Sequence, residues 1–401
     1  MLIQFKFSNF GPFAEEAILD MRAVKSYKEH PDNCIEIDKK YNLLKVALIY
    51  GANASGKTNF VYAYECFSSF VRQSMNSNNE ETNKTIISDH YEPFLFSEDS
   101  KQADTEFEAS YYIDGVELIY GYTYNSNRVT HEWLYKIVSS TGRKSTIFER
   151  DSQSIRLGSS VQRSCEKYVE QIDDSVLVLT FFNRLKLRTD IFDQTYDCVM
   201  SYLAFETTYG HYKSFLYNTY FSYDFDDKEK KSLLSFLSSI NTGIIDITVK
   251  KTKDNIEVFT HHIGVGGKKY KTSFEIESHG TMKAIMLYSL VKVAIREGKG
   301  LIIDELNAQL HPLLLKYIVD MFYSSNSQGH LIYTTHDTVF LEKKYLRRDQ
   351  VWFIEKDKNG KASLYSLSDF KIRPDSSFSK SYLGGAYGGI PILKDFDFDT
   401  E

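Results

Sequence analysis

The residues with the clearest chemical potential form a glycine-rich loop that follows an apolar run. The run from Leu44 to Tyr50 is typical of a buried strand, and the next eight residues read Gly-Ala-Asn-Ala-Ser-Gly-Lys-Thr. Two glycines allow a tight turn in which backbone N–H groups converge on phosphate oxygens, the lysine adds a positive charge, and the threonine hydroxyl can bind Mg²⁺. A helical stretch from Asn59 to Val71 completes the strand, loop and helix that this chemistry needs. An accidental Gly/Lys loop is the alternative. The predicted nucleotide-binding residues are Gly51, Asn53, Ser55, Gly56, Lys57, Thr58 and Asn59.

A pair of carboxylates follows a second apolar run, Gly300 to Ile303. Asp304 and Glu305 follow this run directly, so if the run is a buried parallel strand, the two carboxylates lie at its carboxyl end, at the edge of the sheet. This order predicts that Asp304 holds, through water, the Mg²⁺ that Thr58 binds, and that Glu305 polarises the attacking water as a general base. Pro312 is well placed to begin the next helix.

A histidine ends a third apolar run, Leu331 to Thr335. His336 stands where a sensor of the γ-phosphate would be needed, although a lone histidine in such a place more often bonds a neighbouring loop. Its position after the phosphate loop and the acid pair favours the sensor. The catalytic residues predicted from the sequence are therefore Lys57, Glu305 and His336.

The order of these three elements resembles the ATP-binding-cassette type of P-loop ATPase. The resemblance is to the branch shared by chromosome-maintenance ATPases, DNA-repair ATPases and the overcoming-lysogenisation-defect (OLD) proteins. It implies ATP and Mg²⁺ as cofactors, and it implies a signature segment shortly before the acid pair. Ser278 and Gly280 match the Ser-x-Gly core of that segment, with Thr281 beside them.

The resemblance further implies that the signature of one subunit presses on the γ-phosphate held by another, as in a head-to-tail dimer. A helix N-terminus with a hydroxyl suits this task, because its N–H groups and its dipole both favour an anion. The alternative for Ser278 is a simple N-cap of the following helix.

Two further segments resemble a bacterial group of AAA-annotated, ABC-like ATPases from abortive-infection and anti-phage operons. They are Arg348 to Lys356 and the glycine-rich Tyr382 to Pro391, and the likeness includes the start of the chain, Leu2 to Phe13. It implies a homo-oligomeric ATPase that senses infection, with a phage protein as a trigger, and that controls a separately encoded toxic effector, which we expect to be a nuclease.

Composition limits the classes of function. The formal charge is −6, so the surface as a whole does not carry the positive charge expected of a DNA-binding protein. Whether the protein binds nucleic acid stays an open question. No apolar run approaches the roughly 20 residues that span a bilayer, so we expect a cytoplasmic protein with no membrane partner. The four cysteines lack metal-ligand spacing, and the abundant aromatic residues, 29 Tyr and 28 Phe, predict core and subunit contacts. The acids Asp397 and Asp399 are expected in a solvated tail.

The expected fold is α/β, an ABC-type P-loop ATPase with a mixed central sheet, flanking helices and an antiparallel lobe. Alternating runs between 105 and 137, with a turn at Asp114-Gly115, predict that lobe. We expect residues 1–154 to form the first half of the ATPase, 155–243 a mainly helical insertion, and 244–401 the second half with signature, acid pair, histidine and tail.

Three other functions fit parts of this pattern. An OLD-like nuclease would need a metal-dependent domain, yet only about 65 residues follow His336, against roughly 100 for such a domain. A transporter motor would have a longer, glycine-rich signature. A DNA-repair clamp would have a long coiled coil, which the sequence lacks.

Overall fold

In the computed structural model, two large sheets and a smaller one account for most strands. The structure describes residues 1–38, 42–76, 85–187, 189–206, 208–252, 255–324, 328–372 and 376–391. The acids predicted in the tail, Asp397 and Asp399, lie outside these ranges, as do residues 77–84.

The central sheet carries the three apolar runs whose ends were predicted to do chemistry. Its order is β11-β15-β16-β5-β17-β18, parallel except for the antiparallel edge strand β18. These strands are β5 (Val46–Gly51), β11 (Tyr202–Glu206), β15 (Gly300–Asp304), β16 (His330–Thr334), β17 (Val351–Lys356) and β18 (Ala362–Ser366). Because β5, β15 and β16 are parallel, their carboxyl ends meet at one edge of the sheet.

The second large sheet is antiparallel, with the order β10-β9-β8-β7-β6-β1-β2. Its strands are β1 (Leu2–Ser8), β2 (Ala17–Asp20), β6 (Thr105–Ile113), β7 (Val116–Tyr124), β8 (Val129–Val138), β9 (Arg143–Arg150) and β10 (Ile155–Leu157). The predicted turn at Asp114-Gly115 joins β6 to β7, and both residues have the positive φ that such a turn requires, +46° and +80°. The predicted fold class, mixed α/β with an antiparallel lobe, is confirmed.

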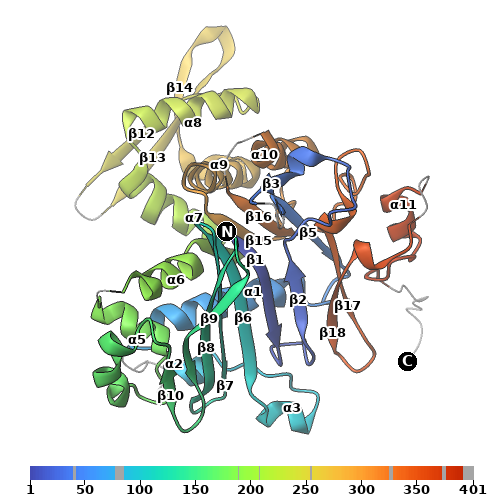
Figure 1. Cartoon of the computed structure of the whole chain (residues 1–401). Helices are drawn as coiled ribbons and strands as arrows, with labels where there is room; N and C mark the ends of the chain where they lie inside the picture. The colour runs from blue at the N-terminus through green and yellow to red at the C-terminus, as the bar shows by residue number, and fades with distance from the viewer. Residues whose placement is uncertain are drawn as a thin grey trace, which may run out of the picture.

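The helices fall into groups that cover different parts of the sheets (Figure 1). The helix α1 (Lys57–Gln73) packs between the two large sheets, whereas α9 (His279–Glu297) and α10 (Pro312–Ser324) cover the other face of the central sheet. The remaining helices are α2 (Ile86–Asp89), α3 (Glu98–Gln102), α4 (Gln162–Cys165), α5 (Val178–Leu185), α6 (Asp190–Met200), α7 (Tyr209–Phe215), a π-helix (Leu216–Asp224), α8 (Asp227–Ser239) and α11 (Phe378–Leu383).

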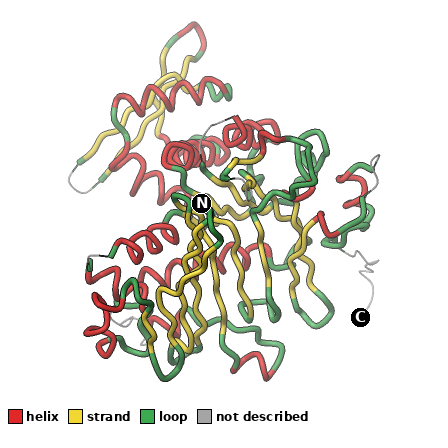
Figure 2. Tube along the Cα trace, in the orientation of Figure 1, coloured by secondary structure: helices red, strands yellow, loops and turns green. Residues whose placement is uncertain are grey.

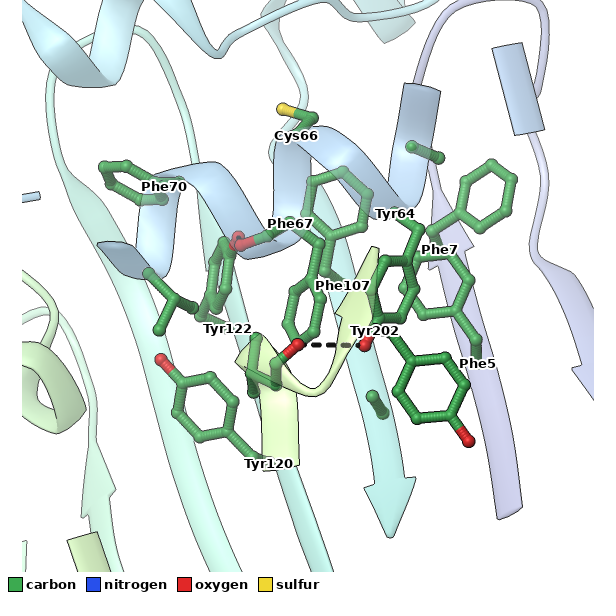
Figure 3. Packing of buried hydrophobic residues seen from close by; sticks show 14 of the residues in the cluster. Phe5, Phe7, Tyr64, Cys66, Phe67, Phe70, Phe107, Tyr120, Tyr122 and Tyr202 are labelled. Carbon is green, nitrogen blue, oxygen red and sulfur yellow. Dashed lines mark hydrogen bonds between the residues drawn. The ribbon is translucent and has the colours of Figure 1, made fainter. Parts of the chain in front are cut away.

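Aromatic rings fill the layer between α1 and the antiparallel sheet. Phe5 of β1 lies 5.7 Å from Phe67 of α1, and Phe107 of β6 lies 5.8 Å from Tyr122 of β7, as centroid distances. Figure 3 shows these rings under the buried side of α1. Since aromatic pairs add to the burial of apolar area, this layer fixes α1 and hence the loop from which it starts.

Two shorter sheets complete the fold. β3 (Cys34–Glu36) pairs with β4 (Asn42–Leu44), and β12 (Ile244–Lys251), β13 (Ile256–Ile263) and β14 (Lys269–Ser273) form an antiparallel sheet of three. The range expected to be a mainly helical insertion, 155–243, also contains two strands. β10 belongs to the antiparallel sheet, and β11 belongs to the central sheet. The domain boundaries themselves stay a prediction.

Candidate functional site

The glycine-rich loop lies between the buried strand β5 and the first turn of α1, as the sequence predicts. Glycine is needed at both ends of the loop for different reasons. A Cβ atom at Gly51 would lie 2.5 Å from Ser55 Oγ and 2.6 Å from Ile354 O, so no side chain fits there. Gly56 has φ +118°, which favours glycine. Ser55 is buried, and its hydroxyl has no hydrogen-bond partner in the described part of the chain.

Lys57 is held over this loop by the loop's own backbone. Its Nζ donates to Gly51 O at 2.9 Å and to Ala52 O at 2.8 Å, and the residue is only 5% exposed. Burial lowers the pKa of Lys57, against the opposing pull of the Asp304 and Glu305 carboxylates. A poorly hydrated ammonium in a loop of convergent N–H groups suits an anion such as a phosphate.

The carboxylate of Asp304 is bonded from both neighbouring elements. Thr58 Oγ1, in the first turn of α1, donates to Oδ2 at 2.7 Å, and Thr334 Oγ1, at the end of β16, donates to Oδ1 at 2.5 Å. Asp304 is buried, whereas Thr58 is exposed. A hydroxyl and a carboxylate are the hard oxygen donors that Mg²⁺ prefers, and Mg²⁺ commonly takes only one or two protein ligands. The donor set of Thr58 and Asp304 therefore fits this ion, and their role as Mg²⁺ ligands stays a prediction.

Glu305 occupies a backbone conformation that is uncommon for a residue with a side chain. Its φ is +45°, and both of its backbone polar groups are bonded by side chains. The N–H donates to Thr334 Oγ1 at 2.8 Å, and the carbonyl accepts from Lys283 Nζ at 3.1 Å. Such strain persists only where the surroundings enforce it, and here two side chains do so. The carboxylate of Glu305 is exposed and lies at the pocket described below.

His336 faces the Glu305 carboxylate. Its Nε2 lies 3.6 Å from Glu305 Oε1. Burial lowers the pKa of His336, and the charge of Lys57 lowers it further, while Glu305 opposes both effects. The imidazole is thus kept neutral near pH 7, so one ring nitrogen can accept a hydrogen bond and the other can donate one.

A pocket of about 280 Å³ brings together most of the predicted residues at this edge, although Gly51, Ser55 and Asp304 do not line it. It is lined by Asn53, Ala54, Gly56, Lys57, Thr58, Asn59, Glu305 and His336. Ligand pockets usually have volumes of roughly 300 to 1,000 Å³, so this one is small for a whole nucleotide. The remainder of a bound nucleotide would lie on the open surface or against another chain.

The predicted signature residues do not line this pocket. Ser278 is the N-cap of α9, where its Oγ accepts from Thr281 N at 3.0 Å and lies 2.8 Å from Thr281 Oγ1. The N-cap alternative is therefore what the isolated chain shows. Gly280 packs against the loop after β15, because a Cβ there would lie 2.8 Å from Gln309 O. The segment stays exposed at Ser278, so another molecule could reach it.

Sequence reasoning missed two residues that position this site. Thr334 contacts both Asp304 and Glu305, and Lys283 of α9 donates to Glu305 O and, at 2.7 Å, to Ala308 O. Burial lowers the pKa of Lys283 to about 8. Lys283 could have been noticed as a lone cation in the apolar run from Met282 to Leu290. Thr334 gives no such signal, since threonine is common in strands.

The part of the chain that carries these site residues also matches a known protein family. A family model described as "AAA domain, putative AbiEii toxin, Type IV TA system" matches residues 46–342, which include the phosphate loop, the signature segment, the acid pair and His336. The chain belongs to this family. It therefore carries an AAA domain, which agrees with the predicted P-loop ATPase at that coarser level. No curated protein is similar enough in sequence to count as a relative of this AAA-domain protein.

Two solved structures resemble this AAA-domain protein at low sequence identity. One is the SMC head domain from Thermotoga maritima, with 13% identity, a TM-score of 0.44, and coverage of 92% of this chain and 99% of that chain. The other is an SMC head bound to the C-winged helix domain of ScpA, with 12% identity, a TM-score of 0.44, and coverage of 91% and 97%. Among the described residues, no helix has the length and apolar character to cross a bilayer.

Proposed function

We propose that this chain binds and hydrolyses ATP at a site that a second copy of the chain completes. The observation that carries the proposal is the convergence of Lys57, Thr58, Asp304, Glu305 and His336 on one pocket edge. Phosphoryl transfer needs positioning and charge stabilisation more than covalent chemistry, and these side chains supply both.

Each side chain has a distinct task in this proposal. Lys57 exchanges its bonds to the loop carbonyls for phosphate oxygens, and Thr58 and Asp304 hold Mg²⁺, which neutralises phosphate charge when bound. Glu305 accepts a proton from the attacking water, since its carboxylate is exposed at the pocket. The neutral His336 bonds the γ-phosphate or the water, and its Nε2 lies within 3.6 Å of Glu305. Ser278, Gly280 and Thr281 act on the nucleotide of the partner copy.

The assignment of the base is tested by Glu305→Gln. Glutamine keeps the size of the side chain but cannot accept the proton, so ATP turnover should fall by about 10²- to 10⁴-fold while ATP binding is retained. Phosphate release and filter binding of radiolabelled ATP measure the two effects. Glu355→Gln is the matched control, because Glu355 also lies near the end of a parallel strand, β17, yet does not line the pocket. Equal turnover in Glu305→Gln and the parent would refute this role.

We further propose that nucleotide state controls a separately encoded toxic effector in an anti-phage, abortive-infection system. The family description supports a toxin–antitoxin context, although taken alone it would make the AAA domain itself the toxin. The separate effector is supported by the resemblance of Leu2 to Phe13, Arg348 to Lys356 and Tyr382 to Pro391 to such ATPases. The work of the ATPase is then conformational: it holds the effector or releases it.

This cellular role is tested with the chain and its neighbouring open reading frames on one plasmid. Phage plaque numbers should fall in the presence of the parent operon, and Lys57→Ala should restore them. Expression of the chain alone should leave growth normal. Growth arrest by the chain alone would make it the toxin itself, and unchanged plaque numbers for a broad phage panel would remove the defence role.

A further inference from the structure

The sheet of β12, β13 and β14 projects from the body of the molecule, as Figures 1 and 2 show. One of its faces is packed. Ile247, Val258 and Thr260 are buried on that face, against the core that includes α8 and the π-helix. Because side chains alternate along a strand, the neighbours of these residues lie on the opposite face, which points to solvent.

The strand register shows which residues share the solvent face. Phe259 of β13 lies opposite Thr248 of β12 and Ser273 of β14. Lys271 lies opposite His261, and Lys269 lies opposite Ile263. Glu257 lies opposite Lys250 on the same face. Two lysines cover the half-buried ring of Phe259: the ammonium of Lys271 is 3.8 Å from its centroid, and that of Lys250 is 5.6 Å away.

Positive charge is concentrated in this sheet although the whole chain is acidic. Residues 244–273 contain six lysines and three acids, whereas the chain has a formal charge of −6. Lys250, Lys268, Lys269 and Lys271 are exposed, and none has an ion-pair partner among the described residues. Asp246, by contrast, is held by Lys230 at 2.7 Å. The unpaired lysines therefore leave a local positive field.

We propose that the solvent face of this sheet binds single-stranded nucleic acid, through an arm face formed by Lys250, Phe259, Ile263, Lys269 and Lys271. Spaced lysines without acidic partners attract successive phosphates, and as Lys250 and Lys271 turn from the ring of Phe259 to the phosphates, the ring gives an exposed base a surface to stack on. An acidic protein would be attracted by the lysines alone. The ring between two of these lysines favours the nucleic acid.

The arm face is connected to the predicted signature through the packed side of β13. Thr260 Oγ1 donates to Glu277 Oε1 at 2.5 Å, and His262 Nε2 lies 2.7 Å from the same oxygen. Glu277 immediately precedes Ser278, the N-cap of α9. A ligand on the arm face can thus bias the residue next to the segment that completes a partner's ATP site. This second part rests on the proposed function; the binding part does not.

Binding is measured by fluorescence anisotropy of a labelled 20-nucleotide oligo(dT) between 50 and 200 mM salt, without ATP. The variant Lys250→Gln with Lys271→Gln should weaken binding at 50 mM salt by roughly 10- to 100-fold, because each lost phosphate contact removes about 0.7 from the salt slope. The control is Lys144→Gln with Lys167→Gln, which also removes two exposed lysines that lie over rings. It should bind like the parent.

The ring is tested separately by Phe259→Leu, which keeps an apolar side chain but removes the stacking surface. We expect about tenfold weaker binding with an unchanged salt slope. Tyr135→Leu, which removes the ring beneath Lys144, is the control and should have no effect. Three results would each overturn the proposal: no binding by the parent at 50 mM salt, equal binding by the double lysine variant, or competition by polyglutamate as strong as that by unlabelled oligonucleotide.

The connection to the ATP site is tested by turnover with and without saturating oligonucleotide. The parent should change its turnover at least about threefold. His262→Leu, which breaks one bond to Glu277 on the packed face, should bind the oligonucleotide normally and lose this response. If the parent binds the oligonucleotide and its turnover does not change, the connection to the ATP site is overturned. The proposal that the arm face binds nucleic acid would be unaffected by that result. Lys57→Ala should lose ATP turnover and still bind the oligonucleotide like the parent. A failure of the proposed ATPase function can therefore be distinguished from a failure of oligonucleotide binding.

Discussion

At the scale of single residues, the site depends on side chains that hold other side chains in place. Glu305 has φ +45°, and its backbone is bonded by Thr334 on one side and Lys283 on the other. Neither of these two residues lines the pocket. They act through Glu305 and Asp304, so their loss should affect turnover more than nucleotide binding.

Lys283→Met tests this positioning. The variant removes the ammonium that bonds the carbonyls of Glu305 and Ala308, so the loop after β15 should relax and kcat should fall by about tenfold or more, with KM changed little. The unfolding free energy should also drop, by about 1 to 3 kcal/mol.

The matched control is Lys45→Met. Lys45 is also largely buried, and its Nζ also donates to a carbonyl, Tyr323 O at 3.0 Å. This contact lies outside the pocket residues, so a similar loss of stability should leave kcat near the parental value. Steady-state kinetics and thermal melts separate the two effects, and equal kcat losses in both variants would contradict a positioning role for Lys283.

At the scale of elements, one buried carboxylate joins the antiparallel sheet to a helix. Glu132 of β8 is fully buried, and it accepts from Val178 N at 2.7 Å and Leu179 N at 3.0 Å in the first turn of α5. Tyr120 donates to it as well, at 3.0 Å. Burial raises the pKa of Glu132 to about 7, although the charge of Arg150 and these hydrogen bonds oppose the shift.

This shift predicts a pH dependence of stability. The folded protein retains the proton of Glu132 up to about pH 7, whereas the unfolded chain loses it near the ordinary value of 4.5. The stabilising contribution is therefore complete below about pH 4.5 and is lost as the pH rises to about 7. The difference in unfolding free energy between the parent and Glu132→Gln should fall by about 3 kcal/mol over this range. Denaturant unfolding at several pH values measures it, and a flat difference would contradict the shift.

The helix α9 connects two parts of the proposed mechanism. Its N-cap, Ser278, belongs to the predicted signature, Gly280 packs against Gln309 O, and Lys283 bonds the carbonyl of Glu305. A movement of the signature toward a partner's nucleotide would thus be felt at the chain's own Glu305. In the proposed dimer, this arrangement gives the two ATP sites a physical route for mutual influence.

At the scale of the whole molecule, the pocket and the signature of one chain are separate surfaces. The predicted signature residues do not line the pocket of their own chain, so in the proposed function a second copy has to supply them. Ser278→Asp is a suitable variant, because aspartate caps a helix as well as serine does, while its charge should repel a phosphate.

Mixing two inactive variants tests completion by a partner. Lys57→Ala lacks the lysine that binds phosphate but has an intact signature. Ser278→Asp keeps Lys57 and the glycine-rich loop but has a damaged signature. Each alone should hydrolyse ATP at least about tenfold more slowly than the parent, and an equimolar mixture should recover up to about a quarter of parental turnover, since mixed dimers contain one intact site. Ser278→Asn, which keeps the cap without the charge, is the control. Full activity of Ser278→Asp alone, or turnover that is unaffected by dilution, would contradict a shared site.

The sequence by itself determined the local units of the site. Gly51, Gly56, Lys57 and Thr58 form a short contiguous loop whose chemistry follows from residue types and spacing, and the apolar runs before Asp304 and His336 have the form of buried parallel strands. These units were predictable because their signals are local: strand pattern, glycine placement and the order of motifs.

Only the tertiary structure decided how these units meet. The hydrogen bond between Thr334 and Asp304 joins residues 30 positions apart, and the one between Lys283 and Glu305 joins residues 22 positions apart. No periodicity in the sequence predicts either of them. Likewise, the arm face emerges only when the register of three strands brings Lys250, Phe259 and Lys271 to one side of a sheet. The physical reason is that hydrogen bonds and cation–π contacts depend on distance in space, which the packing of sheets and helices sets.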